Sequence, residues 1–273
     1  MLKSLLVCVD DTPGTKAACG FAAALAQRAG ARLAGMAVLD TAWIEHGEAA
    51  PLGGSTFLVN LEKKRRNWAA ARAEAGAALF RAAGGTETFE TVSGDPAEAI
   101  VAAAHGHDAV VIGADVRFRE DENDDISEAV EGLVRRSPRP TILVPAAPLE
   151  GRGTLIAFDG SLPATRALHM CVLLGLAGEG PVTLLQAGEA SAEMQAAMAA
   201  AQGLLVQHGI TPQIKALPAH AHAAEAIAIE ADALRPRLLV LGAYGHRRLR
   251  DVVFGSTTER LLAAPPAPLF LFH

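Results

Sequence analysis

The sequence is poor in the residues that build disulfide frameworks, thiolate metal centres and aromatic binding surfaces. Aromatic residues make up 4% of the 273 positions, and the three cysteines, Cys8, Cys19 and Cys171, are scattered without a CxxC pair. An odd number of isolated cysteines argues against disulfides and against a thiolate metal site, so we expect reduced thiols in the core. The low aromatic content favours close packing of helices on a sheet.

Long apolar runs and an excess of basic charge are also missing. The best membrane-span candidate, residues 167–185, is broken by Glu179 and Pro181, and the apolar start of the chain runs directly into Asp10 and Asp11. We therefore expect neither a membrane span nor a signal peptide, and a cytoplasmic protein with no membrane partner. The net charge of −6 argues against nucleic-acid binding, and all of it lies in residues 1–150, which hold 15 basic and 21 acidic residues.

What the sequence does contain is an internal repeat. The run LLVCVDDTP at 5–13 is echoed by LIAFDGSLP at 155–163, DPAEAIVAAAHGHDAVVIGA from Asp95 by HAAEAIAIEADALRPRLLVLGA from His222, and RPTILVP at 139–145 by APLFLFH at 267–273. The first copy is longer by 20 residues, which we place within 41–68 as a loop and an extra helix. The repeat predicts domains at 1–147 and 152–273, joined by the Pro- and Gly-rich linker at 145–153.

Within each copy, short apolar runs alternate with helical patterns. In the second, we expect strands at LIAF, VTLL, QIKAL, LLVL and LFLF, separated by helices near 162–176, 191–208, 222–234 and 256–263. Runs that are apolar at every position are typical of a parallel sheet covered on both faces. Each copy is therefore predicted to be an α/β, doubly wound sheet of about five parallel strands.

In such a sheet, ligands bind beyond the carboxyl ends of the strands. In the second copy these positions hold Asp159 to Ser161 and a loop that reads Gly242, two residues, Gly245, nine residues, Gly255, Ser256 and Thr257. Glycines allow the backbone to approach a phosphate, and a helix that begins at this point directs its free N–H groups toward the anion. The loop also carries Arg247, Arg248 and Arg250, of which we expect at least one to contact phosphate.

These residues resemble the nucleotide-binding signature of the universal stress protein family, Gly-x2-Gly-x9-Gly-(Ser/Thr), in a tandem two-domain member. The resemblance implies an adenine-nucleotide alpha-hydrolase-like fold with strand order 3-2-1-4-5 and pairing through the last strand. It implies that Asp159 binds adenine, that Ala157 and Ala187 line the base, and that Leu241 and Gly242 lie on the ribose side. The phosphates would lie against Gly245, Gly255, Ser256 and Thr257.

The first copy keeps Asp10 and Gly113 but departs from this signature. Val116 stands where Gly245 stands in the second copy, and Ser127, Glu128 and Ala129 replace Gly255, Ser256 and Thr257. The loop between them carries five acidic residues, Glu120, Asp121, Glu122, Asp124 and Asp125, and resembles a solvated segment more than an ordered cation site. Because a triphosphate is strongly negative, we expect this loop to repel it and the first site to be degenerate for ATP.

Each of these residues also has a simpler interpretation. The glycines can serve turn geometry alone, the arginines can form a solvated face, and Asp159 can cap the helix that follows it, although Ser161 can do so too. His220 and His222 have the HxH spacing of a metal site, but polar loop residues ahead of a helix are the favoured interpretation. His105 and His107 lie at the opposite end of a strand from the ligand side and receive no role.

The leading functional hypothesis is a cytoplasmic ATP-binding stress or signalling protein in which the nucleotide, accompanied by Mg²⁺, changes conformation or partner affinity. No Walker A lysine, GxSxG or HExxH motif is present, so we expect binding without efficient turnover and no catalytic residues. Two alternatives stay open: a slow ATPase or nucleotidyl transferase, and a module whose first copy binds a non-nucleotide ligand. The protein partner is unknown. We expect an intramolecular pseudo-dimer through 141–144 and 269–272, with a homodimer left open.

Overall fold

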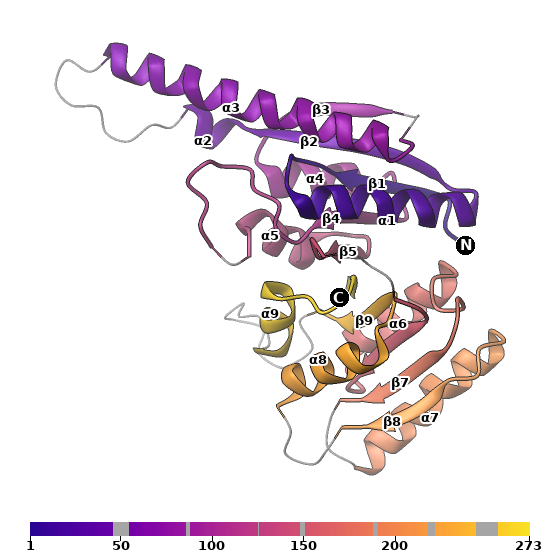
Figure 1. Cartoon of the computed structure of the whole chain (residues 1–273). Helices are drawn as coiled ribbons and strands as arrows, with labels where there is room; N and C mark the ends of the chain where they lie inside the picture. The colour runs from indigo at the N-terminus through magenta and orange to yellow at the C-terminus, as the bar shows by residue number, and fades with distance from the viewer. Residues whose placement is uncertain are drawn as a thin grey trace.

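Two α/β units with the same order of elements share one sheet in the computed structural model (Figure 1). The structure describes residues 1–45, 55–85, 88–124, 126–147, 151–187, 191–217, 222–243 and 256–273. Within these residues the sheet has ten strands. The tandem organisation that the repeat predicts is confirmed.

The first unit alternates strands and helices along the chain. Its elements are β1 (Ser4–Cys8), α1 (Pro13–Ala29), β2 (Arg32–Asp40), α2 (Thr41–Glu45), α3 (Ser55–Ala82), β3 (Phe89–Gly94), α4 (Pro96–Ala104), β4 (Ala109–Gly113), α5 (Glu128–Arg136) and β5 (Thr141–Val144). Every residue of β1, β4 and β5 is buried, because helices cover both faces of the sheet.

The second unit repeats this order without the short helix after its second strand. Its elements are β6 (Thr154–Phe158), α6 (Leu162–Leu173), β7 (Val182–Gln186), α7 (Ala192–Gln207), β8 (Gln213–Ala216), α8 (Ala223–Leu234), β9 (Leu238–Gly242), α9 (Ser256–Ala263) and β10 (Leu269–Phe272). These bounds follow the strands and helices that the apolar runs predict to within a few residues.

Side chains at the helix starts account for where several helices begin. Thr12, Asp95, Ser161 and Ser191 each accept a hydrogen bond from the N–H three residues further on, at the starts of α1, α4, α6 and α7. Such a cap satisfies one of the N–H groups that a helix leaves without an internal acceptor. Proline in the first turn of α1, α4 and α6 adds to this, because its fixed φ suits that position.

The strand order across the sheet is β3-β2-β1-β4-β5-β10-β9-β6-β7-β8. Counted within each unit, this is the order 3-2-1-4-5, with parallel pairing throughout the unit. The two doubly wound sheets of five strands are therefore confirmed. The carboxyl ends of each unit's strands lie at one edge of the sheet. The loops that follow the strands and hold the candidate site residues begin at this edge.

The two units join through their last strands. β5 and β10 pair antiparallel, with Leu143 opposite Leu269, Ile142 opposite Phe270 and Thr141 opposite Leu271. The predicted pseudo-dimer is confirmed, and the pairing removes two apolar strand edges from solvent.

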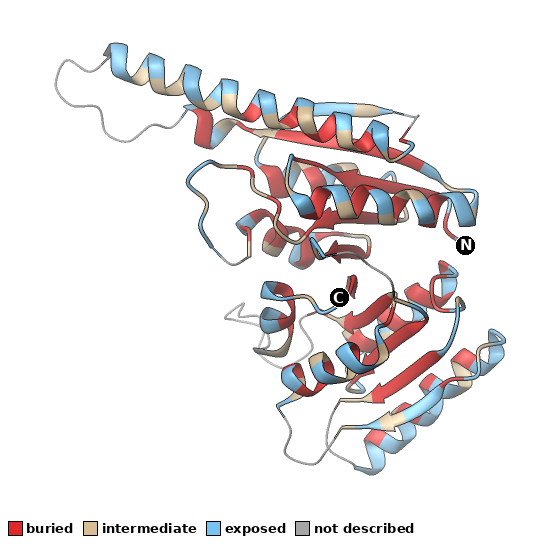
Figure 2. Cartoon of the chain, viewed as in Figure 1, coloured by how far each residue is buried: buried red, intermediate tan, exposed pale blue. Residues whose placement is uncertain are grey.

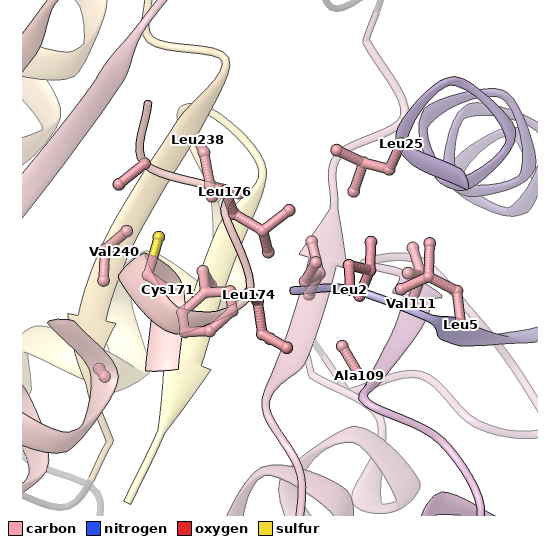
Figure 3. Close-up of a cluster of buried hydrophobic side chains, with 14 of the residues drawn as sticks. Leu2, Leu5, Leu25, Ala109, Val111, Cys171, Leu174, Leu176, Leu238 and Val240 are labelled. Carbon is pink, nitrogen blue, oxygen red and sulfur yellow. The ribbon is translucent and has the colours of Figure 1, made fainter. Parts of the chain in front are cut away.

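Beside this pairing, apolar side chains of both units point toward one another. Leu2 and Leu25 of the first unit lie near Leu174 and Leu176 of the second in the same buried cluster (Figure 3). The N–H of Leu2 also donates to the carbonyl oxygen of Leu174 across the junction (3.1 Å). The interface between the units is therefore part of the core.

Two buried layers sandwich the sheet (Figure 2). One layer holds residues of α1, α3, α6 and α7, and the other holds residues of α4, α5, α8 and α9. The predicted insertion is confirmed as α2 together with a lengthened α3, which has 28 residues against 16 in its counterpart α7. Figure 1 shows the N-terminal end of α3 extending beyond the sheet.

Candidate functional site

Three segments of the second unit that the sequence assigns to a ligand site come together at one edge of the sheet. β6 lies between β7 and β9, so the residues that follow these strands are neighbours. Asp159 comes directly after β6, Ala187 after β7, and Leu241 and Gly242 end β9. The backbone confirms the proximity, since the N–H of Ala187 donates to the carbonyl oxygen of Phe158 (2.8 Å).

Asp159 lies partly exposed in the turn between β6 and α6. Its Oδ1 accepts a hydrogen bond from the N–H of Ser161 (2.9 Å), and Ser161 Oγ accepts one from the N–H of Ala164 (3.2 Å). Ser161 is therefore the cap of α6. The capping interpretation of Asp159 is wrong, because the position two residues later has taken that role, and the Asp159 carboxylate remains at the edge of the sheet.

The small apolar residues of the candidate site are mostly part of the core. Ala157 and Leu241 are buried in the layer covered by α8 and α9, and Ala187 is half-buried against the same layer. These residues belong to the core next to the strand ends, and their contact with a base stays a prediction.

Gly242 has a packing role that the sequence did not indicate. A Cβ at this position would collide with the backbone N of Ala164, in the first turn of α6. The equivalent Gly113 is similar, because a Cβ there would lie 2.7 Å from the backbone N of Thr15 in α1. Both glycines allow a strand to approach the start of a helix closely. Contact between Gly242 and a ribose stays a prediction.

The glycine loop itself falls outside the described residues. Gly245, Arg247 and Gly255 lie there, as do Arg248 and Arg250. The described chain resumes with α9, whose first residue is Ser256 and whose next residue, Thr257, is half-buried. A helix therefore begins where the signature predicts one.

In the first unit, the aspartate at the end of β1 is enclosed by the chain itself. The Asp10 side chain is 5% exposed. Its Oδ1 accepts hydrogen bonds from the N–H (2.9 Å) and Oγ1 (2.7 Å) of Thr12 and from Oγ1 of Thr15. Its Oδ2 accepts from the Arg72 guanidinium (3.0 Å) and from the N–H of Arg117 (2.9 Å). Protein donors therefore already hold both carboxylate oxygens.

A second internal ion pair lies at the end of β2. Asp40 is fully buried, and its Oδ2 accepts from Nε of Arg119 (2.7 Å) while Oδ1 accepts from the N–H of Trp43 (3.0 Å). The other end of Arg119 contacts Glu128 (3.1 Å), and these two carboxylates raise the pKa of Arg119, chiefly through the hydrogen bond to Asp40. A cavity of about 280 Å³ adjoins the pair at the starts of α4 and α5.

The acidic loop of the first unit is more ordered than its composition suggests. Glu120 pairs with Lys64 of α3 (3.1 Å), and Glu122 accepts a hydrogen bond from the N–H of Phe118 (3.1 Å). Arg117 donates to the carbonyl oxygen of Asp124 (3.0 Å). The predicted solvated segment is confirmed for Glu120, Asp121 and Asp124, which are exposed, and the Arg119 guanidinium ties the loop to Asp40 at the end of β2. Asp125 lies outside the described residues.

Sequence reasoning missed four residues at this edge: Asp40, Arg72, Arg117 and Arg119. Arg72 comes from α3, where the insertion lengthens the helix across the strand ends, and its guanidinium lies over the ring of Trp68 (4.7 Å). The only sequence signal was the insertion itself, since a segment present in one copy and absent from the other marks a local difference at the strand ends.

The remaining candidate residues behave as ordinary structural groups where they are described. The three cysteines are free and buried, and burial raises the pKa of the Cys171 thiol to about 12, as expected for reduced core thiols. His222 occupies the N-cap position of α8 without a side-chain capping bond, and His220 lies outside the described residues. The described part of the chain has no helix of the length and apolar character needed to cross a membrane.

Comparison with known proteins gives one consistent result. The model of the universal stress protein family matches the chain twice, over residues 1–145 and 152–273. A universal stress protein of Synechocystis sp. is 25% identical over 291 residues, an alignment that spans 100% of both proteins.

Solved structures agree on the fold. A universal stress protein from Archaeoglobus fulgidus DSM 4304 superposes with a TM-score of 0.63 at 16% identity, over 98% of this chain and 97% of that one. A protein from Pseudomonas aeruginosa UCBPP-PA14 gives a TM-score of 0.54 at 14% identity, over 99% and 93%. The two family matches, one to each unit, identify the chain as a tandem two-domain member of the universal stress protein family.

Proposed function

We propose that the second unit binds one ATP, with Mg²⁺, at the carboxyl edge of β6, β7 and β9, and that the first unit binds none. Occupancy of this site would change the conformation of the chain or its affinity for a protein partner, with at most weak hydrolysis. We place this function in the cytoplasm, where reduced and buried thiols such as those of this chain are usual.

The observation that carries the proposal is the difference between the two equivalent aspartates. Asp159 is partly exposed at the end of β6, whereas the Asp10 side chain is 5% exposed and bonded to two threonines, an arginine and a backbone N–H. Because Asp159 is partly exposed, a base can approach its carboxylate from solvent. At Asp10 it would have to displace Arg72 from a buried carboxylate, which is strongly unfavourable.

The phosphate half of the proposal rests on the signature and on α9. The helix starts at Ser256, directly after Gly255, so its first N–H groups and the positive end of its dipole are available to an anion. The preceding loop carries Arg247, Arg248 and Arg250. In the first unit, the corresponding loop is acidic, the Arg119 guanidinium is paired with Asp40, and the Arg117 guanidinium donates to the carbonyl oxygens of Val116 and Asp124.

The proposal is tested by matched substitutions of the two aspartates. Isothermal titration calorimetry with ATP and Mg²⁺ should give a Kd for Asp159→Asn that is weaker by about tenfold, the usual effect of one lost hydrogen bond to a charged group. Asp10→Asn should leave the Kd within about twofold of the wild-type value. Circular dichroism of both variants controls for folding. Unchanged ATP affinity in Asp159→Asn, or a loss confined to Asp10→Asn, would overturn the assignment.

A further inference from the structure

Arg72 covers the end of β1 from the side of α3. Its Nη2 lies 3.0 Å from Oδ2 of Asp10, and its Nη1 lies 2.6 Å from Oδ1 of Asp11, so one guanidinium bridges two consecutive carboxylates. Helix α3 lies directly against this turn, because a Cβ on Gly76 would come within 2.6 Å of the carbonyl oxygen of Asp10. The arginine therefore reaches the carboxylates from a helix that is packed beside them.

The equivalent turn of the second unit follows β6. Asp10 and Asp159 each accept a hydrogen bond through Oδ1 from the N–H two residues further on (2.9 Å in both), so the two turns are built alike. The residue after the aspartate differs, because Asp11 of the first unit corresponds to Gly160 of the second. The second turn thus has one carboxylate where the first has two.

The equivalent helix, α7, has a small residue at the position of the arginine. Arg72 and Ala197 each lie ten residues before the last residue of their helix. Their contacts agree with this match, since Arg72 contacts Asp11 and a Cβ on Gly160 would lie 3.5 Å from the Cβ of Ala197. Met194, one turn earlier on α7, has its Cε 3.7 Å from the same point. At this turn α7 therefore presents apolar groups where α3 presents a cation.

We propose that Ala197 is a specificity-determining residue of the second unit, whose single methyl group leaves the Asp159 carboxylate accessible to a purine base from the side of α7. A long cationic side chain at this position would cover the carboxylate, as Arg72 covers Asp10. The inference rests on the proposed function and names the α7 residue on which access of the base depends. Asp159 is partly exposed and Ala197 is half-buried beside its turn, which leaves space for a longer side chain.

Adenine would compete poorly with such a side chain. A hydrogen bond between a guanidinium and a carboxylate is charge-assisted and roughly twice as strong as one from a neutral N–H donor, which is what a purine amino group offers. In the first unit the same competition is already decided in favour of Arg72, which lies against the buried carboxylate of Asp10. One residue on the helix after the second strand therefore sets whether a unit admits a base.

The test places an arginine at position 197 and measures ATP binding to the full chain. Isothermal titration calorimetry with ATP and Mg²⁺ should give a Kd for Ala197→Arg that is weaker by about tenfold to a hundredfold, the effect expected for hydrogen bonds to a charged group. Ala197→Lys should weaken binding in the same direction and keeps the test valid if Ala197→Arg does not fold. Ala199→Arg is the matched control, because it adds the same charge at an exposed position of α7 and should leave the Kd within about twofold.

A double-mutant cycle followed by urea unfolding separates the two proposals, because it needs no nucleotide. Adding Asp159→Asn should lower the unfolding midpoint more in Ala197→Arg than in the wild-type chain, since the new guanidinium then loses its carboxylate. Three results would overturn the role of Ala197 and leave the proposed function standing: equal shifts in the two backgrounds, an unchanged Kd for Ala197→Arg, or an equal loss of affinity in Ala199→Arg. A wild-type chain that does not bind ATP would overturn the proposed function, and the role of Ala197 with it.

Discussion

Replacing Arg72 by methionine removes the guanidinium that contacts the buried carboxylate of Asp10. The Arg72 side chain is 20% exposed and that of Asp10 is 5% exposed, so solvent screens this pair weakly. A hydrogen bond to a charged group contributes about 1.5–3 kcal/mol, and the stacking of Arg72 on Trp68 adds about 0.5–1 kcal/mol. Asp10 keeps its threonine and backbone donors, which limits the cost of leaving it unpaired. We expect Arg72→Met to lower the free energy of unfolding by about 2–4 kcal/mol.

Urea unfolding followed by tryptophan fluorescence measures this change. The sequence contains two tryptophans, and both belong to this region, since the rings of Trp43 and Trp68 lie 5.3 Å apart. The matched control is Arg66→Met on the same helix, because Arg66 is half-exposed and pairs with Glu62 at the surface (3.0 Å). It should cost less than about 1 kcal/mol. Equal unfolding curves for the two variants would refute the view that the pair of Arg72 and Asp10 is a buried ion pair that stabilises the first unit.

Two further predictions concern backbone packing and pH. Gly242→Ala should destabilise the second unit by several kcal/mol, because the new Cβ would collide with the backbone of α6. Gly203→Ala, inside α7, should stabilise it by about 0.5–1 kcal/mol, because a Cβ there has no neighbour within 4 Å. Thermal unfolding of the two variants compares these effects. Burial lowers the pKa of His107 below 6.5, so the unfolded chain binds a proton that the folded chain binds less well. Stability should therefore fall as the pH drops through about 6.5, and urea titrations at several pH values should show a smaller fall for His107→Gln.

The strands of the sheet were within reach of the sequence for a definite reason, whereas their order was implied only by the family resemblance. Strands buried on both faces need apolar residues at every position, so runs such as 109–113 and 238–242 stand out against the amphipathic helices beside them. Each of these apolar runs also occurs in both copies of the repeat, which supports its assignment as a strand. Pairing of the last strands also followed, because an apolar edge in each unit, at 141–144 and 269–272, demands a partner.

The ion pairs at the strand ends could not be predicted from the sequence. Asp10 and Arg72 are 62 positions apart, and Asp40 and Arg119 are 79 apart. Which arginine reaches which carboxylate depends on how α3 rotates on the sheet and where the loop after β4 crosses it. The periodicity of the sequence predicts neither the rotation of α3 nor the path of this loop. The composition of the acidic loop therefore predicts its exposed carboxylates but not the contact between Arg119 and Asp40.

The central claim is that one unit of this tandem chain binds ATP and the other does not. Isothermal titration of the purified full chain with ATP and Mg²⁺ tests it most directly, with Gly245→Val as a variant that places a side chain in the predicted phosphate loop. The account predicts a single site per chain that the substitution abolishes, with circular dichroism unchanged. Two equivalent sites per chain, or a single site that survives Gly245→Val, would contradict it.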